Sequence, residues 1–98
     1  MKTSILELPE KVLVVVEGDL DTPSCEQFKA GLAPLMEKAG LHVEMDMSQV
    51  PYISSRGLRV LLALVQAQSA TGGSVKVLSV TPTVKEVFEL TGFDKILL

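Results

Sequence analysis

The sequence predicts an α/β fold, with a mixed sheet of four to five strands and about three helices. Strand-like and helix-like segments follow one another in the order strand, strand, helix, strand, helix, strand, helix. Two of the helical segments begin with Thr-Pro, at Thr22-Pro23 and at Thr81-Pro82. Threonine is a common N-cap and proline a common first helical residue. Strands separated by helices are joined by crossovers, so most of the sheet should be parallel.

The first two strands are predicted close together in the chain. Ser4–Leu8 resembles a short strand, and Pro9-Glu10-Lys11 the turn after it. Val12–Val16 is an unbroken apolar run rich in β-branched residues, which is typical of a central strand buried on both faces. Gly18-Asp19-Leu20-Asp21 ends this strand.

The first helix is predicted to begin with Thr22 as N-cap and Pro23 at the first helical position. Pro34 removes a backbone donor and should bend or tighten this helix. Gly40 is the expected stop. The apolar residues expected on its buried face are Phe28, Leu32, Leu35, Met36 and Ala39.

The second half of the chain repeats the alternation. Val43–Met47 alternates apolar and polar residues with a period of two, as a strand does. A helix should run from Ser55 to about Thr71, where Gly72-Gly73 ends it. Its apolar residues at helical spacing are Leu58, Leu61, Leu62 and Val65.

The last predicted elements are the strand Val75–Val80 and a helix that begins at Thr81-Pro82 and ends at Gly92. The strand leads directly into the helix start. Ile96–Leu98 is predicted to add a final short strand. The inward-facing residues of the helix should be Val84, Val87 and Phe88.

The junction before the second helix carries the clearest chemical signal. Pro51 favours an extended chain before it, and Ser54 and Ser55 stand where the helix begins, so either hydroxyl can cap it. The first turn of a helix presents free N–H groups and the positive end of the dipole, so a phosphate on Ser55 would be tolerated. Arg56 and Arg59 lie near it, and guanidinium groups suit phosphate. The alternative is that both serines are caps and nothing more.

Composition limits the function classes. The chain has 98 residues, of which 47% are apolar, and residues 1–98 are expected to form one domain. A net charge of −3 without a basic stripe argues against nucleic-acid binding. No apolar run approaches membrane-spanning length, and the start shows no signal peptide. With one cysteine and no internal disulfide, a cytoplasmic location is expected.

The residues do not describe an enzyme. His42 is the only histidine and has no metal-ligand spacing to Cys25 or to a carboxylate. Gly72-Gly73 follows a helix, whereas a phosphate-binding glycine loop leads a strand into one. Asp19 and Asp21 are expected to be solvated turn carboxylates. No nucleophile, base and orienting group come together, so neither a metal nor a cofactor is expected.

Four short blocks, in order and with the expected gaps, resemble the motifs of the STAS domain. The similarity is greatest to the free-standing anti-sigma factor antagonists of bacteria and covers nearly the whole chain. The blocks are Gly18-Asp19-Leu20-Asp21, Met45-Asp46-Met47-Ser48, Tyr52-Ile53-Ser54-Ser55-Arg56-Gly57-Leu58-Arg59 and Thr91-Gly92-Phe93-Asp94-Lys95-Ile96.

This resemblance implies a STAS-type fold and a partner-switching function. The unphosphorylated antagonist binds an anti-sigma factor that is also a serine kinase with a histidine-kinase-like ATPase fold, which frees the sigma factor. Phosphorylation by the kinase releases the antagonist, and a metal-dependent serine phosphatase restores it. The family's phosphoacceptor falls on Ser55, and the family's nearby aspartate falls on Asp21.

The chain departs from the family pattern beside the acceptor. Ser54 stands where aspartate is common, which leaves it as a rival acceptor, and Arg56 stands where a small residue is usual. Arg56 either guides the kinase's ATP phosphate or obstructs docking. The residues expected to contact the partner or to lie near the phosphoacceptor are Asp19, Asp21, Thr22, Ser54, Arg56, Gly57, Leu58 and Arg59.

Two other functions stay open. The first is a STAS docking subunit of a lipid-transport ATPase, or a signalling scaffold, in which Ser55 is only a helix cap. A small-ligand or enzymatic role would require a pocket lined by converging polar groups, and no such pocket is expected from the sequence. An exposed edge strand at Ser4–Leu8 would also permit self-association.

Overall fold

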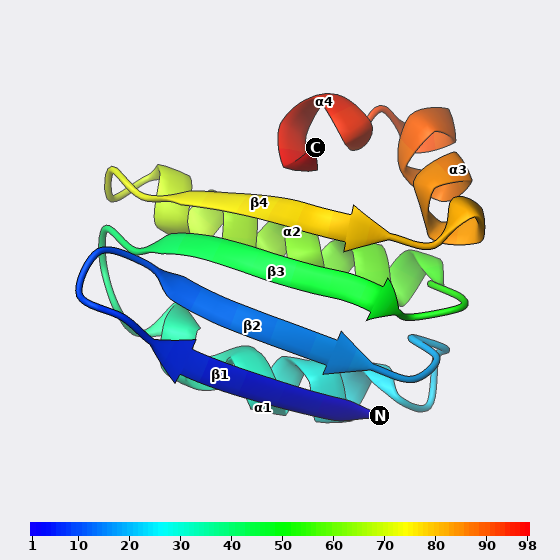
Figure 1. Ribbon diagram of the computed structural model, residues 1–98, viewed down its shortest axis with the longest axis horizontal. Coiled ribbons are helices and arrows are strands. Elements are labelled where there is room, and N and C mark those ends of the chain that lie inside the picture. Colours follow the sequence, from blue (N-terminus) through cyan, green and yellow to red (C-terminus); the bar gives the residue numbers. More distant parts are fainter.

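The computed structural model describes residues 1–98 and contains one mixed sheet of four strands in the order β1-β2-β3-β4 (Figure 1). The edge strand β1 runs antiparallel to β2, whereas β2, β3 and β4 are parallel to one another. The predicted mixed sheet is therefore confirmed. The strands are β1 (Lys2–Glu7), β2 (Val12–Glu17), β3 (His42–Gln49) and β4 (Ser74–Val80).

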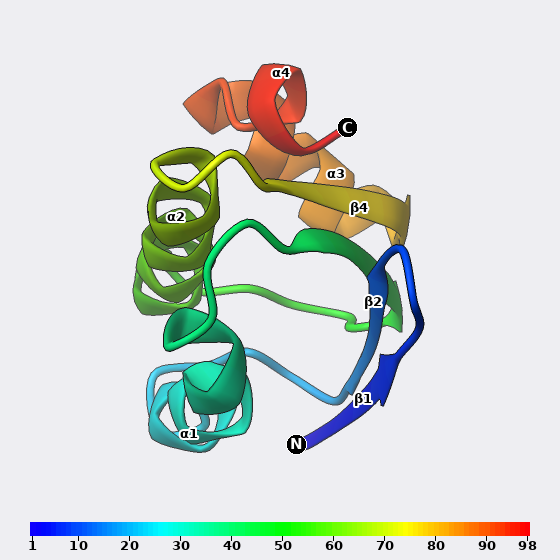
Figure 2. The ribbon, with the colours of Figure 1, turned by 90° about the vertical axis from the view of Figure 1, so that its left-hand side faces the viewer.

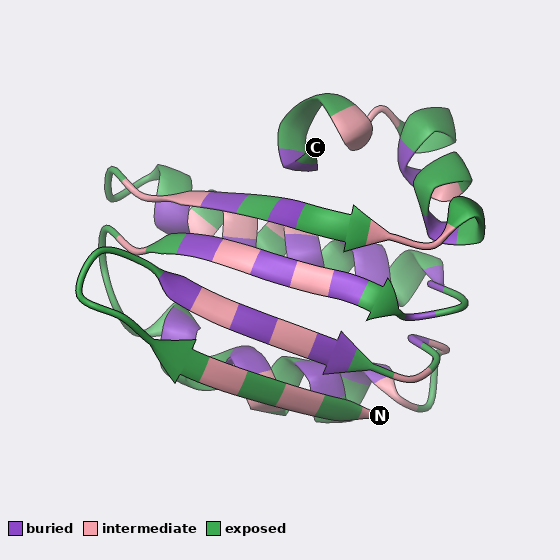
Figure 3. Ribbon diagram, in the orientation of Figure 1, coloured by how far each residue is buried: buried purple, intermediate pink, exposed green.

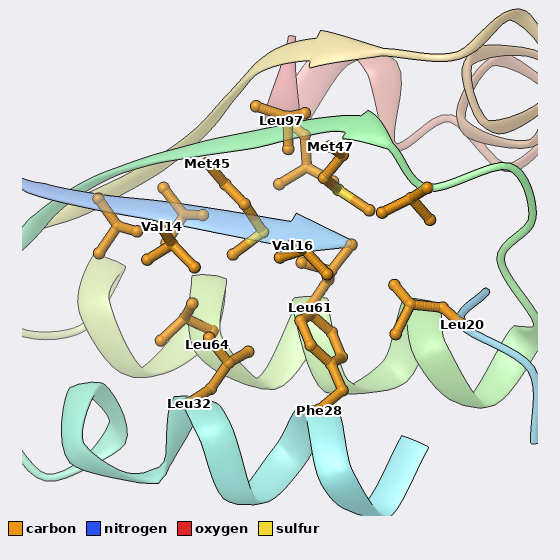
Figure 4. Close-up of a cluster of buried hydrophobic side chains, with 14 of the residues drawn as sticks. Val14, Val16, Leu20, Phe28, Leu32, Met45, Met47, Leu61, Leu64 and Leu97 are labelled. Atoms are coloured by element: carbon orange, nitrogen blue, oxygen red, sulfur yellow. The ribbon is translucent and has the colours of Figure 1, made fainter. Parts of the chain in front are cut away.

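Two long helices lie side by side on one face of the sheet, and two shorter ones lie beyond its β4 edge (Figures 1 and 2). The helices on the face follow two successive parallel strands, and both begin at the same end of the molecule (Figure 4). The four helices are α1 (Cys25–Met36), α2 (Ser55–Ser69), α3 (Pro82–Thr91) and α4 (Asp94–Leu97). None of them is long and apolar enough to cross a lipid bilayer.

The hydrophobic core fills the space between the sheet and the pair α1 and α2 (Figure 4). Every second residue of β2 and β3 points toward the helices, as the period of a strand requires. Fully burying one such aliphatic or aromatic side chain contributes about 1.5–3 kcal/mol. The largest side chains of this core include Leu20, Phe28, Leu32, Met45, Met47, Leu61 and Leu64.

The other face of the sheet has no helix on it, so the prediction that Val12–Val16 is buried on both faces is wrong. Val12, Val14 and Val16 are buried, but Leu13 and Val15 are only half-buried, and the alternation is visible along β2 (Figure 3). The cause is topological. The crossovers from β2 to β3 and from β3 to β4 step in the same direction across the sheet, so right-handed connections place both helices on the same face.

The start of α1 differs from the prediction, because its N-cap position falls on Ser24, which makes no side-chain cap hydrogen bond, and Asp21 closes the turn before the helix. Asp21 Oδ1 accepts a hydrogen bond from the Ser24 N–H at 3.0 Å, and the Cys25 N–H donates to the Thr22 carbonyl at 3.4 Å. Pro23 therefore lies second in a turn that precedes the α-helix. An aspartate side chain that accepts from a backbone N–H a few residues later stabilises such a turn, so the α-helix itself begins only at Cys25.

The end of α1 also comes earlier than predicted. Pro34 lies inside the helix, which ends at Met36, and Gly40 turns the chain with φ = 69°. Met36 and Ala39 are exposed, so their prediction as buried residues is wrong, whereas the other three predicted residues are buried. Because Pro34 cannot donate a backbone hydrogen bond, the helix is already weakened near this point.

A buried glutamine joins the end of α1 to α2. Gln68 Nε2 donates to the carbonyls of Leu35 at 2.7 Å and Lys38 at 2.9 Å, and Gln68 Oε1 accepts from the Leu41 N–H at 2.7 Å. These bonds satisfy backbone groups that the end of α1 leaves without helical partners. The predicted apolar residues Leu62 and Val65 are only half-buried, because the buried face of α2 comprises Gly57, Leu58, Leu61, Leu64 and Gln68.

In the C-terminal region, one prediction is confirmed and another is wrong. Thr81 caps α3 as predicted, since its Oγ1 accepts from the Val84 N–H at 3.4 Å. The predicted strand Ile96–Leu98 is wrong, because the chain forms the short helix α4. Gly92 ends α3 with φ = 79°, and the Leu97 N–H then bonds to the Phe93 carbonyl at 2.8 Å, so no extended segment remains to pair with β4.

Candidate functional site

The loop after β2 and the loop before α2 are joined by backbone hydrogen bonds. The Leu20 N–H donates to the Tyr52 carbonyl at 2.9 Å, and the Ser54 N–H donates to the Leu20 carbonyl at 2.8 Å. Leu20 and Ile53 form an isolated parallel bridge. The segment 18–21 and the segment 52–55 are therefore held together at the carboxyl ends of the parallel strands, and this arrangement defines the candidate site.

Ser54 occupies the N-cap of α2 and is buried, with 8% of its surface exposed. Its Oγ accepts a hydrogen bond from the Gly57 N–H at 3.2 Å and lies 3.5 Å from Cys25 Sγ. Its backbone also contributes, since the Ser54 carbonyl accepts from the Leu58 N–H. The Ser54 hydroxyl is thus used by the fold and shielded from solvent.

Ser55 is the first residue of α2 and is exposed. No side-chain hydrogen bond holds its hydroxyl, and the cap of the helix is supplied by its neighbour. The free N–H groups of the first helical turn lie at this position, and they favour a negative charge. Ser55 therefore presents an accessible hydroxyl at a position where an added anion fits the helix.

Gly57 lets α2 approach the segment 18–21 closely. A Cβ added at Gly57 would lie 3.0 Å from Ile53 Cγ1, 3.3 Å from Leu20 Cβ and 3.4 Å from the Leu20 carbonyl oxygen. Such contacts require a shift of the neighbours, so a larger residue would push the start of α2 outward. Leu58 beside it is 7% exposed and belongs to the core. Both residues position the site and leave little of their own surface for a partner.

The two aspartates of segment 18–21 differ in their roles. Asp21 caps the turn before α1, and hydrogen bonding to Ser24, through its side chain and its backbone N–H, holds the pKa of Asp21 below its ordinary value. Asp19 is exposed, as is Thr22. Because Leu20 pairs with the loop before Ser55, both carboxylates lie in the segment that adjoins the candidate acceptor.

The two arginines of α2 are exposed. Arg56 Nη2 lies 3.7 Å from Glu26 Oε1 on α1, so its guanidinium reaches sideways between the helices. Arg59 follows one turn later and has no carboxylate within 4.0 Å. The structure therefore places a cation beside Ser55 that is already partnered with α1.

Cys25 and Glu26 belong to this site, although neither was predicted. Cys25 is buried, donates from Sγ to the Asp21 carbonyl at 3.0 Å, and approaches Ser54. Each contacts α2 across about thirty positions of sequence, so no local pattern could reveal the contact. No group of three or more His, Cys, Asp or Glu side chains gathers where it could hold a metal ion. His42 lies elsewhere, exposed, with Nδ1 3.0 Å from Ser74 Oγ.

Comparison with known proteins relates this arrangement to one family. The family model described as "Mlab, STAS domain" matches residues 5–98. A curated protein of Bordetella bronchiseptica, named "Putative anti-sigma factor antagonist BtrV", is 31% identical over 93 residues, which is 95% of this chain and 80% of that protein.

Solved structures share the fold. An anti-sigma-factor antagonist (STAS) domain protein from Planctomyces limnophilus superposes with a TM-score of 0.85 at 18% identity, over 97% of this chain and 85% of that one. The anti-sigma factor antagonist SpoIIAA in its unphosphorylated form gives 0.80 at 19% identity, over 99% and 86%, and its phosphorylated form gives 0.73 over 99% and 89%. The chain belongs to the STAS-domain family of anti-sigma factor antagonists.

Proposed function

We propose that this protein is an anti-sigma factor antagonist that is switched off by phosphorylation of Ser55. In its unphosphorylated form it binds an anti-sigma factor that is also a serine kinase with a histidine-kinase-like ATPase fold, and the sigma factor is released. A metal-dependent serine phosphatase reverses the modification. The chain acts in the cytoplasm as one STAS domain spanning residues 1–98, and it acts by binding, not by catalysis.

The observation that carries this proposal is the different environment of the two adjacent serines. Ser54 is buried and caps α2 with its hydroxyl, so a kinase would have to open the helix start to reach it. Ser55 is exposed and its hydroxyl has no structural task. This contrast favours Ser55 as the acceptor and argues against its rival.

Phosphorylation of Ser55 would act mainly through charge. A phosphate adds about −1.5 to −2 charges near pH 7. Asp19 and Asp21 are in the adjoining segment, so the phosphate adds negative charge beside two carboxylates, and of the two nearby arginines only Arg59 is not already paired. Like-charge repulsion against acidic groups on the partner would cost about 2–4 kcal/mol, which weakens binding about 30- to 1,000-fold. No refolding is required, because the start of a helix accommodates an anion.

The test is phosphosite mapping by mass spectrometry on protein recovered from its native cells, with and without serine phosphatase treatment. The expected result is one phosphate on Ser55, absent from a Ser55→Ala variant and retained in Ser54→Ala. A phosphate found on Ser54 would move the site and contradict the argument from burial. An unmodified chain under every growth condition would contradict the switch itself.

A second function is favoured by Arg56. Its ion pair with Glu26 places a partnered cation beside Ser55, where family members usually have a small residue. In this alternative the chain is a constitutive STAS docking subunit of a lipid-transport ATPase or a signalling scaffold. Binding of the natural partner separates the two functions, because a Ser55→Asp variant should lose binding if the switch operates and keep it if the subunit is constitutive.

A further inference from the structure

A groove of about 460 Å³ runs along the outer surface between α1 and α2. Ala33 on α1 and Ala63 on α2 both line it, and these small side chains leave the space open. Leu32 and Val60 form part of its apolar lining. The volume lies within the roughly 300–1,000 Å³ typical of small-ligand sites. This groove is lined mainly by apolar residues, and no signal in the sequence predicted it.

Five charged side chains line the same groove, namely the cations Lys29, Arg56 and Arg59 and the carboxylates Glu26 and Glu37. Arg56 is paired with Glu26 at 3.7 Å, whereas Lys29 and Arg59 have no carboxylate within 4.0 Å. Two unpaired cations, one on each helix, are therefore available to an anion between the helices. A charge-assisted hydrogen bond from either group to such an anion would be stronger than a neutral one.

The cations and the apolar lining are separated along the groove. α1 and α2 begin at the same end of the molecule (Figure 4), and Lys29 and Arg59 each lie in the first two turns of their helix. Ala33 and Ala63 follow about one turn later, and Met36 lines the far part. The end where both helices begin also carries the positive ends of two helix dipoles. The groove thus offers two unpaired cations near the helix starts, followed by an apolar stretch that ends beside Met36 and Glu37.

We propose that this groove binds a single-chain anionic amphiphile, an alkyl chain with a phosphate or carboxylate head, taken up as a monomer from solution. The head lies between Lys29 and Arg59, and the chain lies over Ala33, Val60 and Ala63. The site does not depend on phosphorylation of Ser55.

The test is titration of the ¹⁵N-labelled full chain with dodecyl phosphate below its micelle concentration, followed by two-dimensional NMR. Saturable shifts are expected in α1 and α2 around Lys29, Ala33 and Ala63. Arg59→Gln should weaken binding about tenfold, as expected for loss of one charge-assisted contact. Ala63→Trp should abolish binding by filling the groove.

Control variants outside the groove and ligands with other head groups test whether binding depends on this site and on an anionic head. Lys85→Gln on α3 and Ala30→Trp, which is exposed on α1 outside the groove, should leave the affinity unchanged. An equal affinity for dodecyltrimethylammonium would contradict the requirement for an anionic head group. Binding only to phosphatidylglycerol vesicles would overturn uptake as a monomer. Shifts confined to the uncovered face of the sheet, or no saturable shifts, would overturn the site.

Discussion

Ser54 and Ser55 are adjacent in the chain, yet their hydroxyls have different surroundings. Ser54→Ala removes the cap of α2 and should lower the free energy of unfolding by about 1 kcal/mol. Ser55→Ala changes an exposed first helical residue and should stay within about 0.5 kcal/mol of the parent. Urea denaturation of both variants measures this difference. Equal losses in the two variants would show that the cap is shared.

Asp21 should make stability depend on acidity. Hydrogen bonding to Ser24 places its folded pKa below the ordinary value of 3.8, so the ionised side chain stabilises the folded state above that value. This contribution is lost as the pH falls from about 3.8 through the lower folded pKa. Asp21→Asn retains an oxygen that accepts from the Ser24 N–H but does not titrate, so its unfolding free energy should fall less steeply in this range.

Unfolding of Asp21→Asn at a series of pH values measures that slope. Asp46 provides an internal comparison, because hydrogen bonding to the Ser48 backbone N–H and side chain also lowers its pKa. Part of the acid dependence should therefore persist in Asp21→Asn and diminish further when Asp46→Asn is added. An unchanged slope in both variants would mean that other carboxylates control acid unfolding.

At the scale of elements, the side chain of Gln68 on α2 is hydrogen-bonded to the end of α1 and to the residue before β3. Gln68→Leu would keep the volume similar but remove hydrogen bonds to Leu35, Lys38 and Leu41. Leaving the buried Leu35 carbonyl and the two partly buried groups without partners should cost about 2–4 kcal/mol. Gln66→Leu on the exposed side of the same helix is the matched control and should cost little. Chemical denaturation with an unchanged m-value would attribute the loss to stability alone.

Local sequence signals predicted most elements because those signals act within a few residues. The Thr81-Pro82 start of α3 and the period-two pattern of β3 are both confirmed. The errors arose where a choice depended on competition or on distant contacts. Asp21, Thr22 and Ser24 are all residue types that begin helices, and only the folded chain shows that the N-cap position of α1 falls on Ser24. Gln68 has a polar side chain that no periodic pattern assigns to a core.

The candidate site was partly predictable for the same reason. Ser54, Ser55 and Arg56 are consecutive, so the sequence places them together at a helix start. The contacts of Cys25 and Glu26 with α2 depend on how two parallel helices pack, which the sequence does not specify. The α1–α2 groove likewise exists only because the small residues of two separate helices line one space.

For the molecule as a whole, the proposed switch should be local. The hydroxyl of Ser55 supports no other element, so a phosphate on it should shift backbone NMR signals only in segment 18–21 and the first turns of α1 and α2. Spectra of the unmodified and the stoichiometrically phosphorylated chain measure this, with Ser55→Ala treated identically as the control. Large shifts in β1, β4 or α3 would show a global rearrangement and contradict a local change of charge.

Ser54 caps α2 and Ser55 does not, and this difference affects how such a protein can evolve. A lineage that replaces Ser55 would lose the proposed phosphorylation site but keep its stability, because Ser54 supplies the cap of α2. The same lineage could regain the modification by one reverse substitution. The proposed regulation and the stability of the fold therefore depend on different residues at this helix start, so selection can change either one without compensating changes in the other.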